Sequence, residues 1–204
     1  MAAAGDTVII DSGGANIASL MFALERLGAA ARLARRPQDL DGAARAILPG
    51  VGAAADAMAR LGASGLDEAI RTFARPLLGI CLGMQLLFER SDEGDSRCLG
   101  LIPGEVTRLA PAPGRPVPHM GWNTLHAIRP DPLLAGLGAD EWFYFVHGFH
   151  VAAREGDAAL LARSDYGVPV AAAVRRGNFM GVQFHPERSA AAGARLLRNF
   201  LAID

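Results

Sequence analysis

Three short apolar segments, each followed by a glycine-containing turn and then by a stretch with helical spacing, constrain the fold more than any other feature. These units cover residues 7–28, 45–61 and 76–90. Aliphatic and β-branched runs favour strands, whereas apolar residues three and four apart mark one face of a helix, which here extends through residues 82–90 in the third unit. The alternation predicts an α/β fold with a mostly parallel sheet. Functional residues are then expected beyond the carboxyl ends of the strands.

The second half of the chain has a different texture. Residues 108–123 are rich in proline and glycine, which forbids a long helix and predicts loops that join short strands. Three later runs, 141–147, 168–174 and 178–184, have the aromatic and β-branched content of strands, and 191–202 has the spacing of a closing helix. There is no internal repeat, and the length of 204 residues favours a single domain over 1–204.

Charge and cysteine content exclude several classes of protein. The net charge is -1, which supplies no general electrostatic attraction to nucleic acid or to an anionic membrane. Charged residues interrupt every apolar window, so no membrane span is expected. With only two cysteines and an early charge in the first segment, the sequence favours a cytoplasmic protein over an exported one held by disulfides.

Cys81 is the first candidate for chemistry, because glycines flank it in "GICLG" (residues 79–83). This spacing matches the G-x-S-x-G elbow, a tight strand-to-helix turn that leaves no room for nearby β-carbons. Cys81 would then sit at a helix N-terminus, where the thiolate form of a cysteine is favoured. The alternative is a small buried apolar side chain with no chemical role.

His185 is the candidate partner, since it follows the predicted strand in "GVQFHPERS" and a cysteine nucleophile needs a group that moves protons. In extended backbone, Glu187 would point to the same side and orient the imidazole. The alternative is a surface turn with solvated charges. None of the other histidines (His119, His126, His147 and His150) has a carboxylate so placed, and their spacing with the two cysteines predicts no metal site.

The glycine-rich turn "PGVG" (residues 49–52) is a candidate oxyanion hole. Backbone N–H groups at Gly50, Val51 and Gly52 are suited to stabilise a tetrahedral intermediate. A phosphate-binding loop is the rival interpretation, but the lysine and hydroxyl residue of such a loop are missing. The turn "SGGAN" (residues 12–16) likewise lacks the full dinucleotide fingerprint.

The motifs "PGVG", "GICLGMQ" and "GVQFHPERS", in this order, resemble those of class I glutamine amidotransferases, with Cys81, His185 and Glu187 at the positions of the catalytic triad. The segments "PHMGWN" and "YFVHG" further resemble the glutaminase subunits of imidazole glycerol phosphate synthases. The resemblance extends over nearly the whole chain. It implies a flavodoxin-like α/β fold with helices flanking a mostly parallel sheet, and it implies no cofactor.

The resemblance also implies the reaction. The Cys81 thiolate would attack the side-chain amide of L-glutamine, His185 would protonate the departing ammonia, and water would hydrolyse the thioester. The implied oxyanion donors are Val51, Gly52 and Leu82. The implied glutamine-binding residues are Gly52, Gln85, Gly148 and Phe149, the last two through backbone groups.

A partner is implied as well. In this family the ammonia passes through a tunnel to a (β/α)8-barrel cyclase subunit, with which the glutaminase forms a heterodimer and without which it is nearly idle. The implied contact residues are Trp122, Asn123, Tyr144 and Arg188. Aromatic packing and a solvated charge are the alternative interpretation of these four.

Two departures from the family pattern and several rival functions stay open. Ala53 and Ala54 stand where many relatives carry a bulky aromatic residue. Gly148 and Phe149 stand where a hydroxyl residue and a tyrosine are common, and this second departure bears on the affinity for glutamine if their side chains contribute to binding. The rivals are a subunit of another amidotransferase, a stand-alone γ-glutamyl cysteine hydrolase, a silent scaffold and a flavodoxin-like nucleotide or flavin binder. Cys98 is interpreted as structural.

Overall fold

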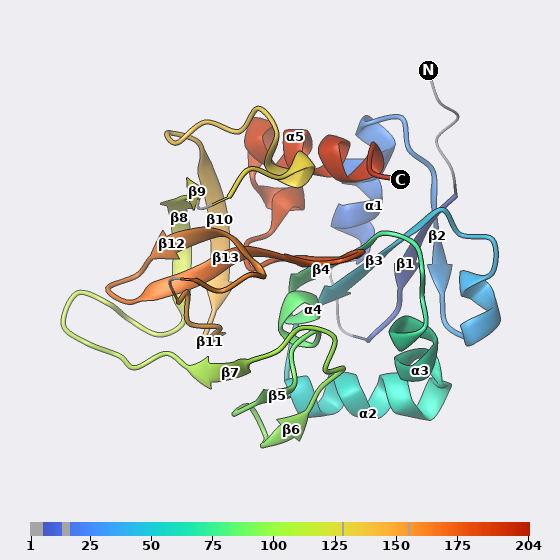
Figure 1. The fold of residues 1–204 in the computed structure, drawn as a ribbon, viewed down its shortest axis with the longest axis horizontal. Helices are drawn as coiled ribbons and strands as arrows, with labels where there is room; N and C mark the ends of the chain where they lie inside the picture. The colour runs from blue at the N-terminus through green and yellow to red at the C-terminus, as the bar shows by residue number, and fades with distance from the viewer. Residues whose placement is uncertain (1–5, 14–16, 128, 155) are drawn as a thin grey trace.

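The computed structural model describes residues 6–13, 17–127, 129–154 and 156–204, so Gly14 to Asn16 of the "SGGAN" turn lie outside the described residues. Its centre is an eight-stranded sheet in the order β2-β1-β3-β4-β14-β13-β12-β9 (Figure 1). The strands are β1 (Thr7–Ile10), β2 (Ala31–Ala34), β3 (Arg45–Gly50), β4 (Leu77–Cys81), β9 (His126–Ala127), β12 (Leu160–Asp165), β13 (Pro169–Arg176) and β14 (Phe179–Val182).

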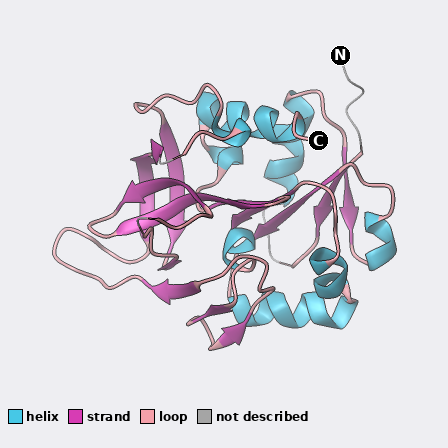
Figure 2. Ribbon diagram, in the orientation of Figure 1, coloured by secondary structure: helices cyan, strands magenta, loops and turns pink. Residues whose placement is uncertain are grey.

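The first five strands in this order run parallel, and the last three add antiparallel pairings. The predicted α/β fold with a mostly parallel sheet is therefore confirmed. Helices cover both faces of the sheet, with α1 and α5 on one side and α2 and α3 on the other (Figures 1 and 2). Their bounds are α1 (Ile17–Arg26), α2 (Ala54–Ser64), α3 (Leu66–Arg71) and α5 (Ala190–Leu201).

Burial on both faces explains why the central strands are apolar at every position. In β1, Val8 and Ile10 belong to the core under α2 and α3, whereas Ile9 between them belongs to the core under α1 and α5. Successive strand residues point to opposite faces, so a sheet covered twice needs apolar residues in an unbroken run. None of the described helices is long and apolar enough to cross a membrane.

Two smaller β structures lie beside the main sheet. A ribbon pairs β8 (His119–Thr124) with β10 (Trp142–His147), and a four-stranded sheet has the order β11-β7-β5-β6. The latter consists of β5 (Arg90–Ser91), β6 (Ser96–Arg97), β7 (Glu105–Arg108) and β11 (Phe149–His150). The proline-rich segment before β8 forms the predicted loop. Single 3₁₀ turns occupy η1 (Pro37–Leu40), η2 (Pro132–Leu134) and η3 (Pro186–Arg188).

The helix after Cys81 is shorter than predicted, because α4 spans only Leu82–Gln85. Residues 99–102 explain this early end. Their backbone N–H groups bond the carbonyl oxygens of Leu86, Leu87 and Phe88, which a longer helix would use for itself. The buried side chains of these three residues then pack into the core rather than along a helix face. The prediction of a helix through residue 90 was therefore wrong.

The glycines around Cys81 are required by close packing between backbones, as their spacing predicted. A Cβ on Gly83 would overlap the carbonyl oxygen of Leu48 in β3. A Cβ on Gly79 would come within 2.6 Å of the carbonyl oxygen of Gly83. Both neighbours are backbone atoms, which cannot rotate away as a side chain can. The β4–α4 turn therefore sits directly against β3.

Gly83→Ala is expected to lower the free energy of unfolding by at least about 2 kcal/mol, since the added methyl group overpacks a backbone contact. Urea denaturation followed by circular dichroism measures the change. The matched control is Gly138→Ala, because a Cβ there has nothing within 4 Å, and it should stay within about 0.5 kcal/mol of the parent protein. Equal stability of the two variants would contradict the packing argument.

Candidate active site

The carboxyl ends of three neighbouring strands bring the candidate residues together. Cys81 is the last residue of β4, and it lies in register with Gly50 at the end of β3. On the other side of β4, β14 pairs Val182 with Ile80, and His185 follows three residues later. A parallel sheet thus delivers the cysteine, the glycine-rich loop and the histidine to one edge.

Cys81 has a backbone conformation that few non-glycine residues adopt, with φ 55° and ψ -110°. Such strain persists only where the surroundings hold it, and it occurs often at reactive residues. The thiol is buried, with 7% of the residue exposed. Its Sγ donates to the carbonyl oxygen of Val146 at 3.7 Å and accepts from Nε2 of Gln183, also at 3.7 Å.

His185 and Glu187 form a buried pair. Nδ1 of His185 lies 2.8 Å from Oε1 of Glu187, and their side chains are 7% and 5% exposed. The predicted proximity is therefore present, but the predicted extended backbone is wrong. Pro186, Glu187 and Arg188 form the 3₁₀ turn η3, which curls the carboxylate back beneath the imidazole. The hydrogen bond to Nδ1 fixes which ring nitrogen of His185 is left for chemistry.

The ring nitrogen Nε2 of His185 is buried and makes no hydrogen bond of ordinary geometry within the described part of the chain. Burial lowers the pKa of His185, but the neighbouring Cys81 and Glu187 outweigh burial and raise that pKa to about 10. The imidazole is therefore protonated at neutral pH. A protonated histidine beside a thiol is suited to give its proton to a leaving group.

The glycine-rich loop borders the same pair. Gly50 and Val51 line a small cavity together with His185 and Glu187. Val51 is 38% exposed, and Gly52 has φ +95°, a conformation that strongly favours glycine. Leu82, the third predicted oxyanion donor, directly follows Cys81. The loop ends where Glu93 accepts a hydrogen bond from the N–H of Ala54, so a carboxylate anchors α2 after it.

Of the predicted glutamine-binding residues, Gln85 and Phe149 are in direct contact, and Gln85 is buried one turn after Cys81. Its Nε2 donates to the carbonyl oxygen of Phe149 at 2.9 Å and to Oε1 of Gln183 at 3.0 Å. The Gly148 carbonyl accepts from the N–H of Leu109. The carbonyl oxygens of Gly148 and Phe149 therefore both have partners within the chain.

Gln183 is the functional candidate that the sequence analysis missed. It stands in "GVQFHPERS", two residues before His185, and it is fully buried. A polar residue within the apolar run 179–184 was the available signal, since a buried amide requires hydrogen-bond partners. Its partners are Cys81 and Gln85.

The predicted contact residues divide into an exposed and a tethered group. Trp122 on β8 and Tyr144 on β10 are in register and in edge contact, and Arg188 lies over the Tyr144 ring at 4.8 Å. Met120, Trp122 and Trp142 expose half or more of their surface on this side of the ribbon. Asn123 instead donates from its side chain to the carbonyl oxygen of Asp165 on β12.

Most of the histidines without a neighbouring carboxylate in the sequence are buried in the fold. His119, His147 and His150 are buried, whereas His126 is exposed. Within the described residues, no group of three or more His, Cys, Asp or Glu side chains is placed to hold a metal ion. Cys98 is buried, and burial raises the pKa of its thiol to about 11, which fits the structural role predicted for it.

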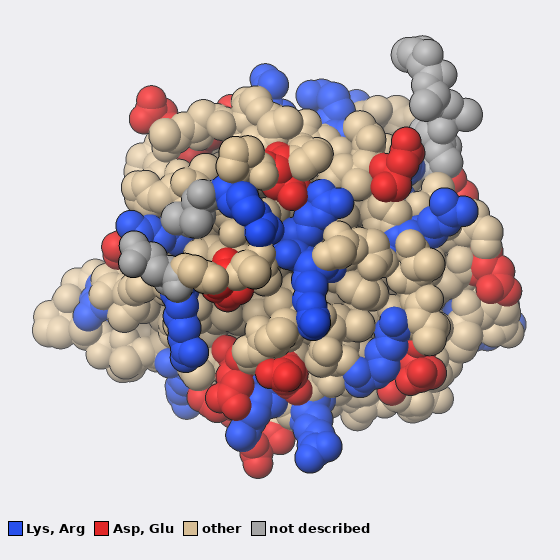
Figure 3. Space-filling view, viewed as in Figure 1, with Lys and Arg blue, Asp and Glu red and all other residues tan. Residues whose placement is uncertain are grey.

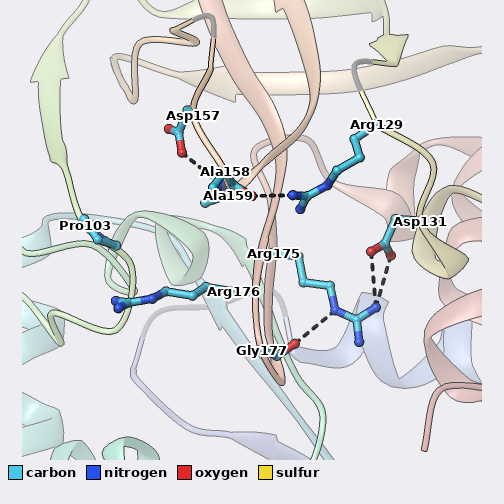
Figure 4. Close-up of a pocket in the computed structure, with 9 residues that line it drawn as sticks. All are labelled: Pro103, Arg129, Asp131, Asp157, Ala158, Ala159, Arg175, Arg176 and Gly177. Carbon is cyan, nitrogen blue, oxygen red and sulfur yellow. Dashed lines mark hydrogen bonds and ion pairs between the residues drawn. The ribbon is translucent and has the colours of Figure 1, made fainter.

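A larger hollow of about 530 Å³ lies near the opposite end of β14 and is separate from this site (Figure 4). Arg175 pairs with Asp131 at 3.2 Å, and Arg129 and Arg176 donate to the carbonyl oxygens of Ala158 and Leu101. Its cations thus already have partners in the protein. On the molecular face in Figure 3, basic and acidic side chains are interspersed rather than gathered in one patch.

A sequence profile of the family described as glutamine amidotransferase class-I matches residues 8–203. The chain belongs to this family. A solved structure titled "Crystal structure of glutamine amidotransferase" is 24% identical with a TM-score of 0.75, and the match covers 96% of each chain. At that identity the likeness shows the fold alone.

Closer relatives come from curated sequences. The "Imidazole glycerol phosphate synthase subunit HisH" of Xanthomonas axonopodis pv. citri is 56% identical over 199 residues, which is 98% of each protein. The protein of the same name from Xylella fastidiosa (strain Temecula1) is 53% identical over the same share. The amidotransferase family predicted from the three motifs is therefore confirmed, and the enzyme class is that of a glutamine amidotransferase.

Acid should destabilise this amidotransferase, because burial lowers the pKa of His119 to about 4, that of His147 to about 3 and that of His150 below its usual 6.5. Below pH 6.5 these histidines bind protons in the unfolded chain but stay neutral in the folded protein. The free energy of unfolding therefore decreases as the pH falls. The raised pKa of His185 has the opposite effect on stability. Its stabilising contribution is present at low pH and is lost as the pH rises through about 10.

We expect the free energy of unfolding to fall by at least about 2 kcal/mol between pH 6.5 and pH 5, measured by urea denaturation. His150→Asn keeps a donor near the carbonyl oxygen of Thr107, which Nδ1 of His150 contacts at 3.2 Å, but removes the titrating group. His150→Asn should therefore make the free energy of unfolding less dependent on pH. The control is His126→Asn at an exposed position, which should leave that pH dependence unchanged. A flat profile for the parent protein would contradict this account.

Proposed function

We propose that this chain is the glutaminase subunit of an imidazole glycerol phosphate synthase and that Cys81, His185 and Glu187 are its catalytic triad. The observation that carries the proposal is the convergence of a strained, buried cysteine and a buried His–Glu pair at one edge of the sheet. The 56% identity to a protein named as that subunit supports the choice within the family.

The chemistry follows from these groups. The Cys81 thiolate attacks the side-chain carbonyl carbon of L-glutamine, and a C–S bond forms. As the tetrahedral intermediate collapses, the C–N bond breaks and protonated His185 gives its proton to the departing ammonia. The product on the enzyme is a glutamyl thioester. Water, activated by the now neutral His185, hydrolyses it to glutamate and regenerates the thiolate.

Glu187 keeps the imidazole oriented and stabilises its protonated form through the 2.8 Å contact with Nδ1. Val51, Gly52 and Leu82 are proposed to supply backbone N–H groups to the oxyanion, with the "PGVG" loop rearranging to do so. Gly52, Gln85, Gly148 and Phe149 are proposed to hold glutamine. No step in this reaction needs a cofactor or a metal ion.

The ammonia is proposed to pass to a cyclase subunit, which forms imidazole glycerol phosphate and aminoimidazole carboxamide ribonucleotide in histidine biosynthesis. The proposed docking surface includes Trp122, Asn123, Tyr144 and Arg188. Its support is the exposure of large apolar side chains on β8 and β10. Aromatic residues and arginine are favoured at interface centres, whereas solvent-exposed tryptophans are costly on a monomer.

The backbone links this surface to the catalytic histidine. The N–H of His185 donates to the carbonyl oxygen of Tyr144 at 2.8 Å, and the Tyr144 N–H donates to Oγ of Ser189 at 2.9 Å. A partner that shifts β10 would therefore act on His185 directly. We further propose that residues 1–204 form a single domain and that the heterodimer works in the cytoplasm.

Glutamate release tests the function. It is measured for this protein alone, with its cognate cyclase subunit, and with that subunit plus its nucleotide ligand. We expect strong stimulation only in the complete mixture and at least about a thousandfold loss in Cys81→Ala, because no other group forms the thioester. Release that ignores the cyclase would reassign the chain to another amidotransferase or a stand-alone hydrolase, and release that survives Cys81→Ala would refute the mechanism.

Trp122→Ala tests the docking surface. We expect a tenfold or greater rise in the dissociation constant for the cyclase, measured by calorimetry, because an interface tryptophan is worth about 2 kcal/mol or more when truncated. Trp122→Phe keeps an aromatic anchor and should recover part of the affinity. Unchanged binding of Trp122→Ala would place the interface elsewhere on the molecule.

A further inference from the structure

Gln183 lies at the centre of a buried hydrogen-bond network that the reaction scheme above does not use. It immediately follows β14, and its backbone N–H donates to the carbonyl oxygen of Ala172 at 3.0 Å. The side chain is completely buried and bridges Cys81 to Gln85, with contacts of 3.7 Å to Sγ and 3.0 Å to Nε2. A buried amide held at both ends has a single orientation.

The partners decide which end of each amide faces which neighbour. The Phe149 carbonyl oxygen can only accept, so the group that Gln85 turns toward it is Nε2. The same Nε2 donates to Gln183, which must therefore present Oε1 to Gln85. The Nε2 of Gln183 is then left to face Cys81. Turning either amide over would set two donors or two acceptors against each other.

Two histidines extend this network at the Phe149 carbonyl oxygen. Nδ1 of His147 lies 2.9 Å from the Phe149 carbonyl oxygen, so it must donate, and its Nε2 is left as an acceptor. Nδ1 of His119 lies 3.1 Å from that Nε2 and donates to it. The His147 ring is thus neutral, in keeping with its lowered pKa, and burial lowers the pKa of His119 as well. The hydrogen bonds from His147 and from Gln85 therefore converge on the Phe149 carbonyl oxygen, and from Gln85 a second series of donors runs through Gln183 to the sulfur.

We infer that Gln183 is a positioning residue for the glutaminase reaction: its amide N–H holds the Cys81 sulfur for attack, and its amide oxygen fixes Gln85. This inference rests on the function proposed above. While Cys81 is a thiol, it donates to the carbonyl oxygen of Val146 and accepts from Gln183. Once the sulfur has lost its proton, it can no longer donate to Val146, and the Gln183 N–H becomes a charge-assisted hydrogen bond.

The same hydrogen bonds also orient Gln85 toward the substrate. Among the described residues, both side-chain hydrogen bonds of Gln85 use Nε2, which leaves its Oε1 as the acceptor for a donor group on glutamine. Gln183 thus couples the state of the nucleophile to the orientation of a substrate contact. A neutral substitution at Gln183 leaves the titratable groups around the sulfur (His185, Glu187 and His147) unchanged, so the effect of the amide can be measured separately.

The test uses Gln183→Glu, which keeps an oxygen for Gln85 but removes the N–H that faces sulfur. The first readout is the rate of Cys81 alkylation by iodoacetamide against pH, followed by mass spectrometry of the Cys81 peptide so that Cys98 does not contribute. We expect the midpoint of that profile to move up by about one pH unit, the tenfold effect of losing one charge-assisted hydrogen bond. Because the new carboxylate also repels a thiolate, the uncharged Gln183→Met is measured in parallel, and a purely structural role would leave its midpoint unchanged.

The second readout is glutaminase activity in the full mixture with the cyclase and its ligand, where kcat/KM of Gln183→Glu should fall about tenfold or more. The control is Gln38→Glu, an identical exchange at an exposed position in η1, which should match the parent protein. If Gln183→Glu does not fold, the alkylation midpoint of Gln183→Met decides alone, and an unmoved midpoint in Gln183→Met overturns the inference.

The outcomes separate the two claims. An unmoved alkylation midpoint and parental kcat/KM in Gln183→Glu would overturn the role of Gln183 while leaving the glutaminase function intact. Absence of glutamate release by the parent protein with the cyclase would instead overturn the proposed function. The alkylation profile does not require turnover, so it would still decide whether Gln183 holds the sulfur.

Discussion

Close contact between the β4–α4 turn and strand β3 is the constraint on which the site depends. With no side chain at Gly83, the turn lies against the Leu48 carbonyl, and Cys81 is forced into its strained conformation beside Gly50. The parallel sheet supplies the rest, since β14 borders β4 and carries His185 to the same edge. Tight backbone packing therefore sets where the sulfur points, and the histidine and glycine-rich loop are built around it.

Strand β10 connects this centre to the molecular surface. The Val146 carbonyl contacts the sulfur, the Tyr144 carbonyl accepts from His185, and the outward side chains of the same strand include Trp142 and Tyr144. One strand thus faces both the reacting groups and the proposed partner. Coupling between two sites requires an element that both of them bias, and β10 is placed to be such an element.

Sequence reasoning succeeded where a local pattern carries the information. The alternation of strand-like and helix-like segments predicted the mostly parallel sheet, and the spacing of the glycines predicted the tight turn at Cys81. It failed where distant segments compete for the same groups. The helix after Cys81 ends at Gln85 because residues 99–102 take the carbonyls beyond it, and Glu187 reaches His185 through a 3₁₀ turn rather than an extended strand. Such competition cannot be predicted from the spacing of residues within one segment.

The sequence by itself therefore determined the fold class, the family and the residue types that carry the chemistry, because each follows from short motifs and periodicity. Only the tertiary structure decided how the buried amides and histidines connect. Gln183 meets Gln85 and Cys81 across about half the chain, and Phe149 accepts from both Gln85 and His147. Each polar group buried by folding must find a partner, and only the folded arrangement determines which partner is within reach.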